Sequence, residues 1–235
     1  MNKINSMKYI DALKEYSEFK KLNDGRFPLV LKLKTLKVDD RTANTEFDAH
    51  YTYHPAWAMR VLKKINPSKH TDISSILSFS AMASAFFKID YYDYRPANIH
   101  LNNLVSKQAD LTKLPFRDES IESLSCMHTL EHIGLGRYGD TIDPQGDRKA
   151  MAELKRVLKK KGNLLIVVPV GKKRILFNSH RIYSYKQIID EFKDFELKEF
   201  TIVPDDASAG MIYKPTAKFV NSQRYACGCF WFKKK

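Results

Sequence analysis

The stretch that decides the fold runs from residue 106 to residue 139 and reads SKQADLTKLPFRDESIESLSCMHTLEHIGLGRYG. Asp110 closes a first strand. Residues 114–120 predict a turn, because their proline fixes φ and their Asp and Ser side chains bond their own backbone. Residues 121–127 then read as a buried strand, followed at once by the polar residues 128–132. Since ligands bind beyond the carboxyl ends of strands in an α/β sheet, this stretch predicts the functional site.

On both sides of this stretch, strand-like and helix-like apolar repeats alternate along the chain. Further strands are predicted near residues 27–38, 71–74, 87–94, 164–170, 195–203 and 225–232. Helices are predicted over residues 7–22, 56–65, 79–86, 97–104, 147–160 and 185–192. Strands that alternate with helices favour an α/β fold with a mostly parallel, doubly wound sheet and helices on both faces.

Proline and glycine set the expected boundaries. Pro55 suits the first turn of the helix over 56–65, which should end before Pro67 because the residue before proline avoids the helical region. Gly162 is expected to cap the helix over 147–160. We predict an N-terminal helical extension over residues 1–55, whose histidine-rich end could close over the ligand as a lid, and one domain over residues 56–235.

The composition is that of an ordinary globular protein, with 43% hydrophobic and 29% charged residues in 235. No apolar run approaches the roughly 18–20 residues that span a bilayer, and the N-terminus lacks the apolar core of a signal peptide, so we expect a cytoplasmic protein. Three cysteines are too few for a disulfide framework. The pair in Cys227-Gly-Cys229 is interpreted as packed thiols, since no further cysteine exists to complete a thiolate metal site.

The net charge of +13 predicts an anionic partner. The basic residues are scattered, however, and no zinc finger, helix-turn-helix or aromatic RNA-binding signature accompanies them, so nucleic acid is not the expected partner. A generally lysine-rich composition explains the charge equally well, and the expected partner is a small-molecule or glycan substrate that could carry an anionic group.

Four segments in order resemble the second half of a class I S-adenosylmethionine-dependent methyltransferase: Asp110-Leu-x-x-Leu-Pro-Phe-x-Asp-x-Ser-Ile, His128-Thr-Leu-Glu-His, Glu153-Leu-x-Arg156-Val-Leu-Lys-x-x-Gly162 and Val168-Pro169. Three more are similar to a smaller bacterial family of uncharacterised methyltransferase-like proteins: Gly134-Leu-Gly-Arg-Tyr-Gly-Asp, Asp143-Pro-x-Gly and Cys227-Gly. The resemblance implies a Rossmann-like methyltransferase fold, seven strands with the last pair antiparallel, and S-adenosylmethionine as cofactor.

The resemblance also implies the cofactor residues. Asp93, with Asp90 as its rival, matches the acidic residue that binds the ribose hydroxyls, and a carboxylate can accept both hydrogen bonds of a vicinal diol. Asp110 and Leu111 match the positions that hold the adenine amino group. The predicted cofactor-binding set is completed by residues near the ends of the first and fourth strands: Asp72, Ser74 and His128.

The chain departs from the family at the glycine-rich loop. The family has Asp-x-Gly-x-Gly-x-Gly, whereas this chain has Asp72-Ile-Ser-Ser-Ile-Leu-Ser, so the glycine positions hold Ser74, Ile76 and Ser78. A β-branched Ile76 should crowd the cofactor and resist positive φ. This replacement motivates an alternative, a non-catalytic nucleotide- or ligand-binding protein on the same scaffold.

Methyl transfer to oxygen or nitrogen needs a base, and histidine titrates near neutral pH. We select His132 and His180 as candidate catalytic residues, because each follows a strand at the expected ligand edge. Candidate substrate-binding residues are His50, His54, Glu131, Arg137, Tyr138, Asn178 and Arg181. The two arginines could bind a carboxylate or phosphate through paired hydrogen bonds.

The resemblance implies a methyltransferase acting on a small molecule or glycan precursor, and the smaller family's link to bacterial surface polysaccharides implies a sugar or nucleotide-sugar acceptor. A second alternative is a metal-dependent hydrolase, because His128-x-x-Glu131-His132 also spells the inverted zinc-peptidase motif. That motif needs a helix under it, and here a strand is expected to end just before His128. No metal ligand is therefore assigned.

Overall fold

The computed structural model describes residues 3–235, with side chains from Met7 onward; Met1 and Asn2, which begin the predicted extension, lie outside the described residues. The chain divides into two units, Met1–Phe47 and Asp48–Lys235. The second unit therefore starts at Asp48 rather than at residue 56.

The first unit contains α1 (Lys3–Leu22) and the 3-10 helix η1 (Leu33–Thr35). The strand predicted over residues 27–38 is wrong, because this segment pairs with no other strand among the described residues. Its apolar side chains are largely exposed, as Val30 shows with 66% of its surface accessible. A strand without a neighbour leaves its backbone N–H and C=O groups unpaired, so alternation of apolar and polar residues was not enough to form a strand here.

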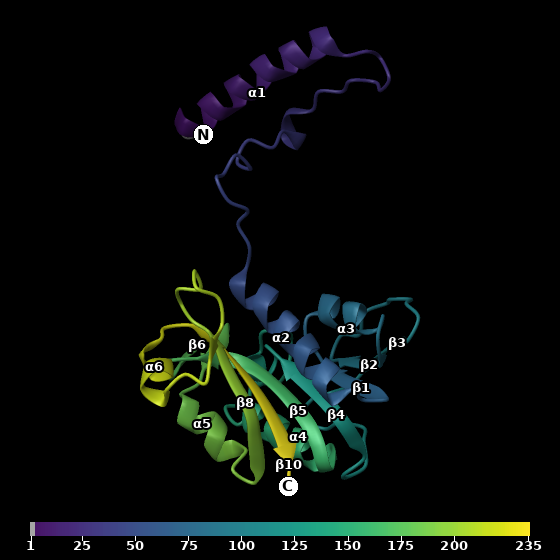
Figure 1. The fold of residues 1–235 in the computed structure, drawn as a ribbon, viewed down its shortest axis with the longest axis vertical. Helices are drawn as coiled ribbons and strands as arrows, with labels where there is room; N and C mark the ends of the chain where they lie inside the picture. Colours follow the sequence, from purple (N-terminus) through teal and green to yellow (C-terminus); the bar gives the residue numbers. More distant parts are fainter. Residues whose placement is uncertain (1–2) are drawn as a thin grey trace. The chain divides into compact units, whose positions relative to one another are not determined.

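The second unit is built on a mostly parallel sheet with strand order β3-β2-β1-β4-β5-β10-β8-β9 among the described residues (Figure 1). Its strands are β1 (Lys69–Ile73), β2 (Lys88–Asp93), β3 (Leu104–Gln108), β4 (Ile121–Met127), β5 (Leu158–Val170), β8 (Phe195–Val203), β9 (Ile212–Tyr213) and β10 (Ala226–Lys234). The predicted α/β fold and mostly parallel sheet are confirmed. Strand β10 runs antiparallel to both β5 and β8, and β9 adds a two-residue edge strand to the seven expected.

Helices cover both faces of this sheet. They are α2 (Ala49–Ile65), α3 (Leu77–Ala83), α4 (Gly146–Val157), α5 (Tyr185–Glu191) and α6 (Ala217–Ser222). In β5, Leu165 and Val167 pack with α2 and α3, whereas Leu164, Ile166 and Val168 pack with the other three helices. The unbroken apolar run of this strand thus reflects a central position with two buried faces.

Helix α2, which crosses the sheet in Figure 1, begins earlier than predicted. The Asp48 side chain accepts a hydrogen bond from the Tyr51 backbone N–H (3.0 Å) and caps the helix, which places Pro55 inside it rather than in its first turn. The predicted end is confirmed, because Asn66 adopts a left-handed conformation before Pro67. The segment expected to form a lid is therefore part of a long helix of the second unit.

Two other sequence-based expectations are wrong. The helix over residues 97–104 is absent; Asn103 has φ +61° and β3 begins at once. Helix α4 ends at Val157 and not at Gly162, which lies within β5. A Cβ at Gly162 would come within 2.8 Å of the Lys159 carbonyl oxygen, so close backbone approach explains this glycine.

A separate two-stranded ribbon, β6 (Arg174–Leu176) and β7 (His180–Ile182), leads from β5 toward α5. Across residues 3–235 we find no helix with the length and apolar character that crossing a bilayer would require.

Candidate functional site

A cavity of about 400 Å³ opens beyond the carboxyl ends of β1, β2 and β4. Its volume lies in the range of small-molecule sites. Seven predicted residues line it: Ser74, Asp93, Asp110, Leu111, His128, His132 and Tyr138. The structure therefore brings most of the predicted cofactor residues to one place, with one candidate base beside them.

The turn between β1 and α3 reaches a left-handed conformation without glycine. Ser74 adopts φ +56°, the left-handed conformation that glycine favours, and its N–H donates to the Tyr92 carbonyl oxygen (2.7 Å). Ile76 has φ −55° and packs into the core beneath α2. The expected crowding by Ile76 is therefore wrong, because its side chain does not line the cavity.

Asp93 presents its carboxylate at the end of β2. It accepts hydrogen bonds from the Tyr91 hydroxyl (3.1 Å) and the Arg95 N–H (2.7 Å), which fix its orientation while it lines the cavity. Its rival Asp90 does not line the cavity and forms an ion pair with Lys69. The geometry thus favours Asp93 over Asp90.

Asp72 is fully buried and does not line the cavity. Its carboxylate accepts hydrogen bonds from three hydroxyl groups, those of Ser75 (2.5 Å), Ser80 (2.6 Å) and Ser125. Burial raises the pKa of Asp72 to about 6. Through these bonds Asp72 connects the turn to α3 and β4, and none of its three partners occupies one of the family's glycine positions.

The raised pKa makes the stability contribution of Asp72 depend on pH. The folded chain binds the Asp72 proton more tightly than the unfolded chain, so the stabilisation is complete below pH 3.8 and is lost as pH rises through about 6. That interval corresponds to roughly 3 kcal/mol. We expect the difference in unfolding free energy between the wild type and Asp72→Asn to fall by about this amount between pH 4 and pH 7 in urea titrations. A difference that is constant or grows with pH would contradict it.

The loop between β4 and α4 folds around Asp140, which accepts hydrogen bonds from the backbone N–H groups of Gly134 (2.8 Å), Gly136 (3.3 Å) and Tyr138 (3.1 Å). Burial acts against the charged form, but these bonds hold the pKa of Asp140 below its usual range. Gly134 has φ +78°, and a Cβ there would lie 2.1 Å from the Asp143 carbonyl oxygen. The glycine-rich segment is therefore one wall of the cavity.

His132 lines the cavity, and one of its ring nitrogens is held by a backbone carbonyl. Its Nδ1 lies 2.7 Å from the Ser179 carbonyl oxygen, which assigns the proton to Nδ1 and leaves the lone pair on Nε2. Burial lowers the pKa of His132, so the ring is neutral at pH 7. Tyr138 packs edge-on against the ring at 5.8 Å, with the Arg95 guanidinium over the tyrosine face at 4.6 Å.

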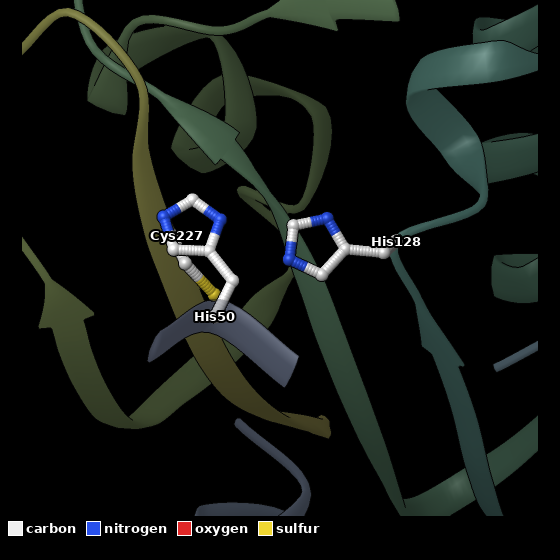
Figure 2. Close-up of side chains that lie close together, drawn as sticks. All are labelled: His50, His128 and Cys227. Atoms are coloured by element: carbon white, nitrogen blue, oxygen red, sulfur yellow. The ribbon is translucent and has the colours of Figure 1, made fainter. Parts of the chain in front are cut away.

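A second group of aromatic and sulfur side chains gathers behind His128 (Figure 2). The His50 ring stacks on His128 at 5.6 Å between centroids and on Tyr225 at 5.0 Å, and His54 meets His128 edge-on at 5.0 Å. His50 lines a second cavity of about 370 Å³ together with Arg174, Asp205 and Arg224. Neither His50 nor His54 lines the first cavity, so the structure does not place them where the predicted substrate-binding residues were expected.

Burial dominates the titration of this group. Burial lowers the pKa of His50 to about 4 and that of His54 to about 3. Burial also opposes the charged form of His128, but its neighbours Cys227 and Glu131 raise the pKa above the usual value. Burial raises the pKa of the Cys227 thiol.

Five other predicted residues do not line the first cavity: Glu131, Arg137, Asn178, His180 and Arg181. Arg181 is 5% exposed, donates to the Ile133 carbonyl oxygen (2.7 Å) and pairs with Asp147 (3.6 Å), so its donors serve the fold. Asn178 is exposed on the β6–β7 turn. His180 packs against Tyr225 at 4.8 Å, and burial lowers its pKa.

Glu131 is 1% exposed and accepts a hydrogen bond from His128 Nδ1 (2.7 Å). Residues 130–132 form the short 3-10 helix η2 and not the α-helix that the zinc-peptidase motif needs. Among the described side chains, the group that could hold a metal ion combines His128 with His50 and Cys227, and His132 is not in it. The structure therefore does not group His128 with His132 as metal ligands.

Several cavity residues were not selected from the sequence: Tyr94, Arg95, Ala109, Thr112, Thr129, Ile133, Gly134, Thr141, Asp143, Gly146 and Lys149. Three of them, Gly134, Asp143 and Gly146, fall in the glycine-containing segments quoted above for the smaller family. Three glycines close together after a strand were the available signal, because they predict a tightly folded loop at the ligand edge.

Comparison with known proteins agrees with this architecture. A family model described as "Caenorhabditis protein of unknown function, DUF268" matches residues 73–203, which is more than half of the chain. The chain belongs to this family. The description names Caenorhabditis, so the bacterial origin inferred from the sequence stays an expectation. An uncharacterized protein of Methanocaldococcus jannaschii is 34% identical over 99 residues, a match that spans 40% of this chain and 37% of that relative's length.

Solved structures share the fold at low identity. An S-adenosylmethionine-dependent methyltransferase of Methanosarcina mazei has a TM-score of 0.52 and 14% identity, covering 74% of this chain and 96% of its own. The N-methyltransferase NodS of Bradyrhizobium japonicum, solved with S-adenosyl-L-homocysteine, has a TM-score of 0.53 and 11% identity, covering 77% and 85%. At these identities the likeness establishes a methyltransferase-like fold.

Proposed function

We propose that this member of the DUF268 family is an S-adenosylmethionine-dependent methyltransferase that binds its cofactor in the first cavity. The observation that supports this most is the position of that cavity. It lies beyond β1, β2 and β4, with Ser74, Asp93 and Asp110 at successive strand ends. The structural relatives support the same function at the level of the scaffold.

The side chains of the cavity suit this cofactor. Asp93 would accept the ribose hydroxyls, and Asp110 and Leu111 would hold the adenine. The left-handed turn at Ser74 leaves a small side chain where the chain passes the cofactor. Four carboxylates line the cavity: those of Asp93, Asp110, Asp140 and Asp143. They outnumber the lining cations Arg95 and Lys149, and this excess of negative charge suits the positive charge of a sulfonium. The cofactor would supply an electrophilic methyl group.

His132 would accept the proton of the attacking hydroxyl or amine. Its Nδ1–H is held by Ser179, so Nε2 is the basic atom. The acceptor is proposed to be a small molecule or glycan precursor, such as one used in surface polysaccharide synthesis. An anionic group on the acceptor would be attracted by Arg137, whose guanidinium lies beside His132.

We expect His132→Asn to lower methyl transfer about 100-fold or more, because general base catalysis typically contributes 10²–10⁴. Binding of S-adenosylmethionine should change little, since the cofactor contacts are assigned to Asp93, Asp110 and Leu111 and not to His132. The measurement is transfer of a labelled methyl group from S-adenosylmethionine into the low-molecular-mass fraction of a cell extract. Because the pKa of His132 is lowered, wild-type transfer should persist below pH 6.5.

His100→Asn is the matched control, because His100 is exposed and does not line the cavity. It should transfer as the wild type does. Binding of the cofactor without any labelled product in several extracts would favour the non-catalytic alternative. Wild-type transfer that is unchanged in His132→Asn would assign the base elsewhere.

A further inference from the structure

Three potential metal ligands converge behind His128 from separate parts of the second unit. His50 lies in the first turn of α2, His128 directly follows β4, and Cys227 lies near the start of β10. One ligand atom from each residue lies within 4.8 Å of the other two. Figure 2 shows the His50 and His128 rings side by side with the Cys227 sulfur close to them.

Two buried ring nitrogens of this group have no hydrogen-bond partner. His128 Nε2 is buried and makes no hydrogen bond, although its Nδ1 is engaged by Glu131. The neighbouring His54 Nε2 is also buried and makes no hydrogen bond. Buried polar atoms in proteins nearly always have partners, so an orphaned ring nitrogen aimed at a thiol requires an explanation.

From this geometry we infer that His50, His128 and Cys227 bind one Zn²⁺ ion. Two imidazoles and one thiolate are ligands that zinc prefers, and three protein ligands with a fourth open position are typical of zinc sites that also bind water or substrate. Mg²⁺ and Ca²⁺ prefer oxygen ligands, which this group lacks. Neither Cys229 nor a third cysteine is needed for such a site.

Glu131 supplies the outer support that such a site requires. Its carboxylate accepts the Nδ1–H of His128, and this bond turns Nε2 toward His50 and Cys227. Histidines that bind metals almost always donate their other N–H to a carboxylate or carbonyl in this way. Glu131 is 1% exposed, so this hydrogen bond is shielded from water.

The site must contract when it binds the ion. Zinc bonds of about 2.0–2.3 Å place tetrahedral ligand atoms about 3.5 Å apart, compared with separations of up to 4.8 Å here. His50 can move, because it is only half-buried and lies at the start of its helix. It lines the second cavity whereas His128 lines the first, so the ion would lie where the two cavities approach each other.

The test is titration of chelator-treated protein with Co²⁺, a spectroscopic substitute for Zn²⁺. We expect saturation at one ion per chain, with sulfur-to-cobalt charge transfer in the near ultraviolet and the visible bands of tetrahedral cobalt. Cys227→Ser should abolish the charge-transfer band, and His50→Ala should weaken cobalt binding at least 10-fold. Two controls lie outside the group and should behave as the wild type: Cys126→Ser and His100→Ala.

Thermal unfolding would show whether each variant is folded. If Cys227→Ser fails to fold because Cys227 is buried, His50→Ala still tests the site. The inference is overturned if wild-type protein gives no saturable cobalt spectrum, or if the spectrum survives in both variants, in which case the rings only pack against one another. Binding of S-adenosyl-L-homocysteine to the chelator-treated protein, measured separately, keeps this outcome distinct from that of the proposed function.

Discussion

Replacing Asp93 by Ala should weaken the binding of S-adenosyl-L-homocysteine about 30- to 1000-fold. A carboxylate that accepts both hydroxyls of a ribose makes two charge-assisted hydrogen bonds, which together contribute roughly 2–4 kcal/mol, and about 1.4 kcal/mol corresponds to a tenfold change in affinity. Isothermal titration calorimetry measures the change. Asp93→Asn should lie between Ala and the wild type, because an amide keeps one acceptor oxygen.

The same strand provides a matched control. Asp90 lies three residues earlier in β2, pairs with Lys69 and does not line the cavity, so Asp90→Ala should bind the ligand within about twofold of the wild type. Equal losses in the two variants would indicate a general effect on the fold. Tight binding that survives in Asp93→Ala would remove this residue from the cofactor site.

Replacing Arg181 by Met should destabilise the protein by about 3–5 kcal/mol, because it leaves a buried carboxylate without its cation. The side chains of Arg181 and Asp147 are 6% and 10% exposed, and the guanidinium also donates to backbone carbonyls of the loop before α4. Urea unfolding measures the loss. Arg181→Lys should keep part of the stability, since it retains the charge but not the planar donor group.

Arg174→Met is the control, since Arg174 is exposed on β6; it should change the unfolding free energy by less than about 1 kcal/mol. A small effect of Arg181→Met on stability, combined with weaker binding of an anionic acceptor, would instead restore the substrate-binding role predicted from the sequence.

The sheet could be predicted because its strands carry strong local signals. The run from Leu164 to Val170 is apolar throughout, and the strand from Ile121 to Met127 lies between a proline turn and a polar cluster. The expected strand over residues 27–38 failed because strand formation depends on a partner, which alternation within one segment cannot reveal. The start of α2 was missed because Asp48 is an effective cap, whereas Pro55 drew the prediction seven residues further along.

The site was partly predictable for a similar reason. Asp93, Asp110 and His128 follow strands, and the carboxyl ends of parallel strands meet at one edge of the sheet. Side chains that depend on long-range packing could not be placed. The Arg181 guanidinium donates to loop carbonyls and pairs with Asp147. Cys227 lies beside His128 only because β10 pairs with β5 near the end of β5.

The most direct test of the central claim is a crystal structure of the protein with S-adenosyl-L-homocysteine. We predict the ribose hydroxyls within hydrogen-bonding distance of the Asp93 carboxylate, the adenine beside Asp110 and Leu111, and the sulfur on the side of the cavity nearer His132. A nucleoside bound away from Asp93, or a first cavity that stays empty at saturating ligand, would contradict the account.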